Sequence, residues 1–353
     1  MNLLDQTINA IQLPDRSIYH KAMERLSNQA RPAGSLGILE PLSARLAGIA
    51  KAMDVRLTNK IVVTCAGDHG IVAEGVSLFP QEVTAQMVYN FVNGGASISV
   101  LAKHAGASVK VADLGVNHDF DPGLPIFHYK IRKGTSNFAI EPAMTRQEAL
   151  QSIEAGIKIA DSLVENESVD MIGTGDMGIG NTTPSTAIIA TFSGIDPAKL
   201  AGRGTGIDDT ALEKKIHVIK KSLLLHKPDP KDPIDVLSKV GGFEIGALCG
   251  LVLGAAKHAI PVVCDGFIST AGALLACELA PNAKAYLFAG HRSVEIGHQF
   301  MLERLGLTPI LDLNFRLGEG TGAVLSMEML DAATRILSDI KTFQETGINN
   351  AQK

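Results

Sequence analysis

The sequence predicts an α/β fold, in which a mainly parallel six-stranded sheet carries helices on both faces. Six short runs are almost continuously apolar, which is typical of strands covered on both faces. Longer segments with helical spacing lie between these runs, and both ends of the chain are helical in pattern without a strand. Strands that alternate with helices indicate a mainly parallel sheet.

Most of the six apolar runs end at a glycine or an aspartate, residues that favour turns. The runs occupy residues 60–70, 108–116, 168–176, 260–266, 284–290 and 308–315. In sheets of this kind, ligands bind beyond the carboxyl ends of the strands. The polar residues in the turns are therefore expected to converge on one edge of the sheet: Asp68, His69, Asp113, Asp265, His291 and Arg292.

Two segments between the strands, 145–164 and 269–280, have helical spacing. The apolar run 245–256 predicts a buried helix, because its 12 residues are too few to span a bilayer. Residues 227–242 are rich in proline and lysine and predict an exposed loop.

The two ends of the chain are expected to form a small helical domain. Residues 17–29 and 36–53 have helical patterns, and residues 322–343 form one long amphipathic pattern. Since chain termini often lie close together, the prediction is a large α/β domain at 58–321. The small domain would combine residues 1–57 with residues 322–353.

The composition indicates a cytoplasmic protein that acts on small molecules. The formal net charge is −5, which argues against nucleic acid or an anionic membrane as the main partner. The N-terminus has no signal-peptide pattern and no membrane span is expected. The four cysteines form no C-x-x-C pair, which favours reduced, buried thiols: Cys65, Cys249, Cys264 and Cys277.

The loop 173–183 carries the glycine spacing G-x-G-x-x-G, which is associated with dinucleotides. Asp176 interrupts it, and Asp196 is not preceded by the separate helix and strand that a ribose-binding acid requires. Thr183 is expected to be the N-cap of a helix with Pro184 at its first position. A helix that begins in a glycine loop offers free N–H groups to one phosphate or carboxylate. A tight turn that needs positive φ is the structural alternative.

Two further glycine-rich loops precede helices. In 316–324, Gly318, Gly320 and Gly322 surround Glu319, which is either a ligand contact or a solvated loop residue. In 201–221, Asp208 is a predicted N-cap and Lys214 and Lys215 follow it, either to reach a phosphate or as a solvated helix face. No histidine spacing of the kind that binds zinc is present, so no metal and no cofactor are expected.

Eight motifs occur in the order seen in the nicotinate-nucleotide–dimethylbenzimidazole phosphoribosyltransferases, and the sequence resembles that family over nearly its whole length. They are RPAGSLGILE (31–40), AGDHGIVAEGVSLFPQEVTAQMV (66–88), GTGDMGIGNTT (173–183), GRGTGIDD (202–209), GGFEIGAL (241–248), DGFISTAGALLA (265–276), GHRSVEIGH (290–298) and LGEGTGA (317–323). The resemblance implies a homodimer with a Rossmann-like six-stranded sheet and a small helical domain from both termini.

The resemblance also implies the reaction, in which 5-phosphoribose moves from nicotinate mononucleotide to 5,6-dimethylbenzimidazole. The products would be α-ribazole 5′-phosphate and nicotinate, with inversion at C1′ and Glu319 as the general base. The expected substrate-binding residues are Asp176, Gly175, Gly178, Gly180, Asn181, Lys215, Gly318, Gly320, Pro80, Gln86, Asp265 and Arg292.

Two positions depart from the family pattern. Asp176 stands where a glutamate is expected, and Leu78 stands where a small residue is expected. A nucleotide hydrolase and a non-catalytic nucleotide-binding protein remain the alternative functions.

Overall fold

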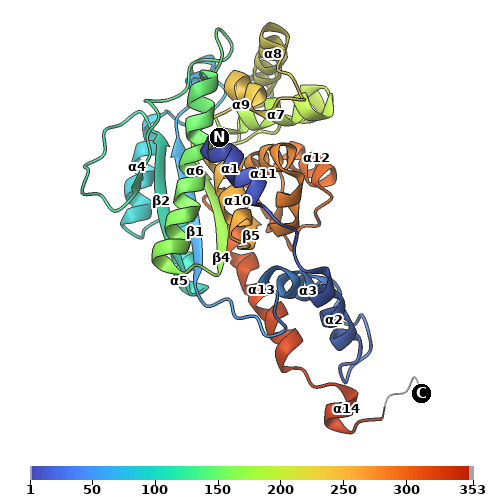
Figure 1. Cartoon of the computed structure of the whole chain (residues 1–353). Coiled ribbons are helices and arrows are strands. Elements are labelled where there is room, and N and C mark those ends of the chain that lie inside the picture. Colours follow the sequence, from blue (N-terminus) through green and yellow to red (C-terminus); the bar gives the residue numbers. More distant parts are fainter. Residues whose placement is uncertain (1, 350–353) are drawn as a thin grey trace.

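The computed structural model describes residues 2–349 and contains one parallel six-stranded sheet (Figure 1). Its strand order is β3-β2-β1-β4-β5-β6, so the order reverses between β1 and β4. Every neighbouring pair is parallel. The strands are β1 (Lys60–Gly67), β2 (Ala107–Gly115), β3 (Phe127–His128), β4 (Met171–Met177), β5 (Val262–Cys264) and β6 (Leu287–Ala289).

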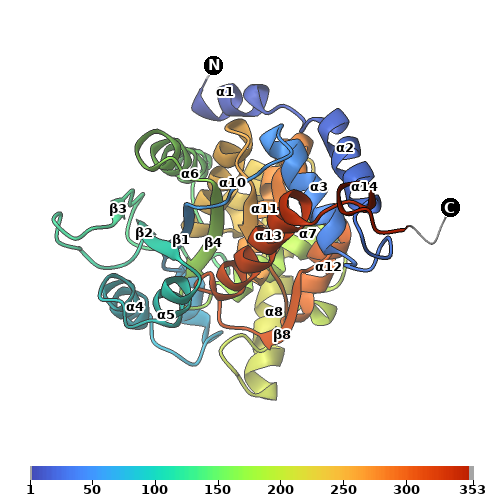
Figure 2. The ribbon, with the colours of Figure 1, turned by 90° about the horizontal axis from the view of Figure 1, so that it is seen from below.

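Helices cover both faces of this sheet (Figure 2). On one face, α10 (Phe243–Lys257) packs on β1, β2 and β4, and α6 (Arg146–Glu167) and α11 (Phe267–Leu279) pack beside it. On the other face lie α4 (Glu82–Val92), α5 (Ser97–His104) and the first part of α13 (Thr321–Asp339). All residues of β1 are buried because they lie between these two layers.

The remaining helices surround this three-layer core. They are α1 (Leu3–Ala10), α2 (Arg16–Ser27), α3 (Leu39–Ala50), α7 (Thr182–Ser193), α8 (Asp209–His226), α9 (Pro233–Val240), α12 (Ile296–Leu305) and α14 (Phe343–Thr346). Short 3₁₀ turns occupy Gly70–Glu74, Pro197–Lys199 and Pro281–Tyr286. The predicted buried helix at 245–256 is confirmed, since every residue of α10 except Lys257 is buried.

The two ends of the chain meet away from the sheet. Helix α13 packs on α2 and α3 beyond its contacts with β4 and β5, and α14 lies next to this group (Figure 1). Helix α1 instead packs on α6 and α10. A small helical domain made from both termini stays a prediction, and α1 would lie outside it.

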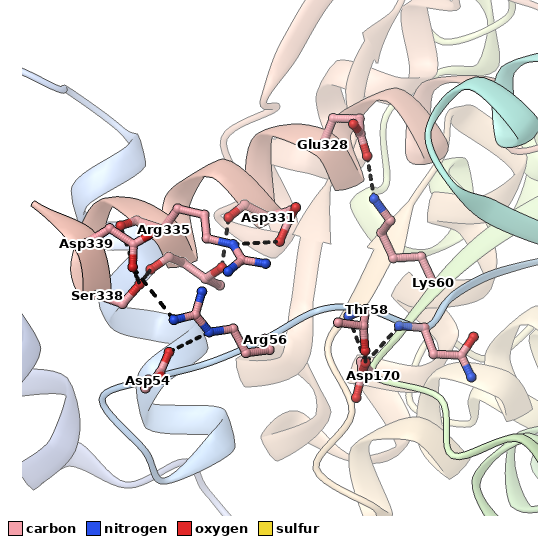
Figure 3. Close-up of polar contacts among 12 residues, drawn as sticks. Asp54, Arg56, Thr58, Lys60, Asp170, Glu328, Asp331, Arg335, Ser338 and Asp339 are labelled. Carbon is pink, nitrogen blue, oxygen red and sulfur yellow. Dashed lines mark hydrogen bonds and ion pairs between the residues drawn. The ribbon is translucent and has the colours of Figure 1, made fainter.

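The segment that leads from α3 to β1 follows the surface of α13 (Figure 3). We call the cluster of Asp54, Arg56 and Lys60 with Glu328 and Asp339 of α13 the joint. Arg56 forms ion pairs with Asp54 at 2.7 Å and with Asp339 at 3.7 Å. Lys60, the first residue of β1, pairs with Glu328 on α13. The joint therefore consists mainly of exposed charges.

Three local predictions were wrong. Residues 308–315 do not join the main sheet. Instead, β8 (Leu311–Phe315) pairs in parallel with β7 (His291–Ser293), and β3 supplies the sixth strand. No residue of β8 is fully buried, so the apolar residues of this run do not form a core strand. The segment 227–242 contains α9, whose apolar face is buried. Helix α7 begins at Thr182 and not after Thr183. Its N-cap is Asn181, whose carbonyl accepts the N–H of Ser185.

The Asp208 N-cap is confirmed by its bond from the N–H of Ala211. The cysteines are free, and three of the four are buried. Among residues 2–349, no helix is both long enough and apolar enough to cross a membrane.

Candidate active site

A cavity of about 720 Å³ opens at the carboxyl ends of the strands, beside the point where the strand order reverses. Doubly wound sheets bind their ligands at this position. Its wall is formed by residues from seven separate parts of the chain, which fall within 76–87, 97–101, 176–182, 204–205, 266–268, 291–295 and 314–321.

Glu319 enters the cavity from an unusual backbone turn. Gly318, Glu319 and Gly320 have φ values of 86°, 64° and 102°, all in the left-handed region. A non-glycine residue is uncommon there and the conformation costs free energy, so surrounding contacts must hold it. Gly175 makes the turn possible, because a Cβ on it would lie 2.2 Å from the Glu319 carbonyl oxygen.

The Glu319 side chain is 5% exposed and lines the cavity. Its Oε2 accepts a hydrogen bond of 3.1 Å from the N–H of Ile98, in the first turn of α5. Burial raises the pKa of Glu319, the Ile98 bond opposes this, and the Asp265 carboxylate adds to the increase. A buried carboxylate with a raised pKa has the basicity that a general base needs near neutral pH.

Asp176 lies at the end of β4, and its carboxylate is about 3 Å from the position of a Cβ on Gly318. Its Oδ2 accepts a 2.9 Å hydrogen bond from the Asn181 amide, whereas its buried Oδ1 has no partner. Burial, followed by the nearby Asp265 carboxylate, raises the pKa of Asp176 well above the ordinary value. We therefore expect Asp176 to hold a proton that it can donate to a ligand.

The N-terminus of α7 and the loop before it form another part of the cavity wall. Gly178, Gly180 and Asn181 line it, and Asn181 caps the helix without a side-chain bond. Lys215 lies directly behind this turn, and its Nζ donates to Thr182 Oγ1 at 2.7 Å. Burial lowers the pKa of Lys215 to about 8, against the opposing effect of Glu295. The N–H groups of Asn181 and Thr183 already bond the carbonyls of Gly178 and Gly180, so it is the positive end of the helix dipole next to a lysine that favours an anion here.

An apolar wall from α4, α5 and the segment that precedes α4 completes the cavity. It consists of Val76, Phe79, Val83, Met87 and Leu101. From this segment the sequence analysis named Pro80 and Gln86 and not Val83 and Met87, although the i, i+4 spacing of Val83 and Met87 in a helix places them on one face. This wall suits a flat aromatic ring.

Four expected substrate contacts lie outside the cavity wall. Pro80 and Gln86 are exposed beside it, as is Leu78, which is 61% exposed. Arg292 is also exposed and lies 3.7 Å from Asp312. Asp265 is fully buried behind the Glu319 loop.

Three more expected residues lie behind the wall: Gly175, Lys215 and Gly320. The structure therefore brings the other six expected catalytic or substrate-binding residues to the cavity surface. They are Asp176, Gly178, Gly180, Asn181, Gly318 and Glu319. Glu295 was missed: it lines the cavity and accepts the N–H of Gly204 at 2.9 Å. Within residues 2–349, no group of three or more histidine, cysteine or acidic side chains is arranged to hold a metal ion.

The chain matches the model of a protein family described as phosphoribosyltransferase over residues 11–348. The fold and the match together define the class: the chain is a phosphoribosyltransferase, a transferase enzyme.

Its relatives narrow the class. The chain is 55% identical to the nicotinate-nucleotide–dimethylbenzimidazole phosphoribosyltransferase of Citrifermentans bemidjiense over 348 residues, which cover 99% of each chain. It is 50% identical to the enzyme of that name from Chloroflexus aggregans, with both chains fully covered. The crystal structure of CobT from Thermus thermophilus superposes with a TM-score of 0.91 at 43% identity, covering 95% of this chain and all of that one. The chain belongs to the nicotinate-nucleotide–dimethylbenzimidazole phosphoribosyltransferase family.

Proposed function

We propose that the protein transfers 5-phosphoribose from nicotinate mononucleotide to 5,6-dimethylbenzimidazole. The products are α-ribazole 5′-phosphate and nicotinate, and the reaction serves assembly of the cobalamin nucleotide loop. The observation that carries this proposal is that Glu319 lines one cavity together with an apolar wall for an aromatic base and a helix N-terminus for a phosphate.

One ring nitrogen of the benzimidazole attacks C1′ of the ribose from the face opposite the leaving group, which inverts the configuration. The C1′–N bond to the pyridinium breaks, and its electron pair returns to the nicotinate nitrogen. The leaving group needs no acid, because its ring nitrogen is already positively charged. The N–H proton of the attacking base goes to Glu319, as in general-base catalysis.

The phosphate binds at the N-terminus of α7, where Lys215 supplies a positive charge. A raised pKa lets Asp176 donate a hydrogen bond to the ligand while Glu319 accepts a proton. The two carboxyl groups of one cavity therefore take different roles.

The test is product analysis with and without dimethylbenzimidazole. The proposal predicts nicotinate release that depends on dimethylbenzimidazole, with α-ribazole 5′-phosphate formed in equal amount. Nicotinate release that ignores the benzimidazole would show a hydrolase. Binding without turnover would show a nucleotide-binding protein.

We also propose a cytoplasmic homodimer. Exposed apolar side chains near the cavity mouth support the dimer: Val294, Ile296, Leu313 and Leu317. Such side chains often mark protein–protein contacts. Light scattering on the purified protein measures its mass, and a monomer would contradict this proposal.

A further inference from the structure

Asp265 is a buried carboxylate that the proposed reaction does not use. It follows β5, is 0% exposed and does not form part of the cavity wall. A fully buried carboxylate is costly unless it is paired or hydrogen-bonded. Its contacts show what stabilises it.

Three backbone N–H groups at the start of α13 donate to Asp265. The N–H of Gly320 donates to Oδ2 at 3.2 Å, and those of Gly322 and Ala323 donate to Oδ1 at 2.7 and 3.0 Å. The Nε2 atom of His291 lies 3.6 Å from Oδ1. The carboxylate thus caps α13 from a distant part of the chain, since Gly320 supplies no side-chain cap.

The same bonds fix the residue next to Gly320, which is Glu319. Two further bonds hold its main chain: Thr64 Oγ1 donates to the Glu319 carbonyl at 2.9 Å, and the Glu319 N–H donates to the Asp176 carbonyl at 3.1 Å. Packing allows little other movement, because a Cβ on Gly322 would lie 1.9 Å from His291 Cδ2. The Asp265 side chain therefore ties this left-handed turn to the helix behind it.

We infer that Asp265 is a positioning residue, which holds the turn that presents Glu319 to the cavity and does not itself contact the substrate. This inference rests on the proposed function, in which Glu319 is the base. A displacement of about 1 Å in a catalytic group can reduce the rate about 100-fold. Loss of Asp265 should therefore act through Glu319.

The test is a double-mutant cycle with Asp265→Asn and Glu319→Ala. Asp265→Asn should lower kcat about 100-fold, while calorimetry shows the Kd for nicotinate mononucleotide within about threefold of the unmodified enzyme. In the Glu319→Ala background, Asp265→Asn should cost less than about threefold more, because residues that act as a unit are not additive.

Asp170→Asn is the matched control. Asp170 accepts the N–H groups of Thr58 and Asn59 at 2.8 Å, but it precedes β4 and lies outside the cavity (Figure 3). Asp170→Asn makes the same change at a carboxylate that accepts backbone N–H groups away from the cavity, so it should leave kcat unchanged.

Thr64→Val provides a second variant if Asp265→Asn fails to fold. It removes one bond to the Glu319 main chain with little change of volume, and it should also lower kcat with Kd retained. Rate losses that multiply in the cycle, or a weakened Kd, would overturn the inference. Absence of transfer by the unmodified enzyme would instead refute the proposed function.

Discussion

Acidic side chains behave in opposite ways at two places in the molecule, the joint and the cavity floor, which is formed by Asp176 and Glu319. At the joint, Asp54 and Asp339 are 65% and 58% exposed and pair with Arg56 (Figure 3). At the cavity floor, Asp176 and Glu319 are about 5% exposed, and neither has an arginine or lysine partner among residues 2–349.

Burial, more than residue type, decides what a carboxylate does in this protein. Water and salt screen the exposed pairs at the joint, which therefore contribute little to stability. Burial raises the pKa of both carboxyl groups at the floor, and Asp265 increases the effect. The carboxyl groups of the cavity floor are thus suited to proton transfer, whereas the charges of the joint mainly keep that part of the surface hydrated.

The largest expected effect is at the floor. Glu319→Gln keeps the side-chain shape but removes the base, so kcat should fall about 10²- to 10⁴-fold. Steady-state kinetics measures this, and calorimetry should show that nicotinate mononucleotide still binds. Turnover close to that of the unmodified enzyme would remove Glu319 as the base.

A smaller effect is expected at Lys215, which is the buried cation beside the α7 N-terminus. Lys215→Met should raise the KM for nicotinate mononucleotide about 10- to 100-fold, because it removes the buried positive charge next to the phosphate-binding turn. Nicotinate riboside, which lacks the phosphate, is the control substrate and should be affected much less. An equal loss for both substrates would show that Lys215 does not recognise the phosphate.

Lys215 also gives this binding a pH dependence. Burial lowers its pKa to about 8, so the positive charge is present below pH 8 and is lost as the pH rises through that value. Affinity for the nucleotide should fall over the same range, and Lys215→Met should abolish that fall.

The smallest effect is expected at the joint. Arg56→Ala should change the free energy of unfolding by less than about 1 kcal/mol and leave kcat unchanged. Urea titration measures the change, and it should shrink further in high salt. A large loss of stability would show that the exposed ion pairs of the joint contribute substantially to folding.

The sequence predicts those features that depend on local pattern. The apolar run at 60–70 contains β1, because nearly continuous apolar character is typical of a strand that is buried on both faces. The prediction that residues 308–315 form a strand of the main sheet was wrong. An apolar run does not reveal whether a strand pairs inside the core or at a half-exposed edge.

The role of Asp265 could not be predicted, because its partners are backbone N–H groups 55 or more residues further along the chain. The apolar residues of the wall were not named for a related reason. Val83 and Met87 have the pattern of ordinary core residues, and only the fold shows that they face a cavity.

The pH dependence of kcat tests the central claim most directly. Glu319 must be ionised to accept a proton, and its pKa is raised, so kcat should rise with pH through that pKa, up to the pH at which Asp176 loses the proton that it donates. In Glu319→Gln the remaining activity should show no such rise. The same rise in the Glu319→Gln variant would assign the base to another residue and contradict the account.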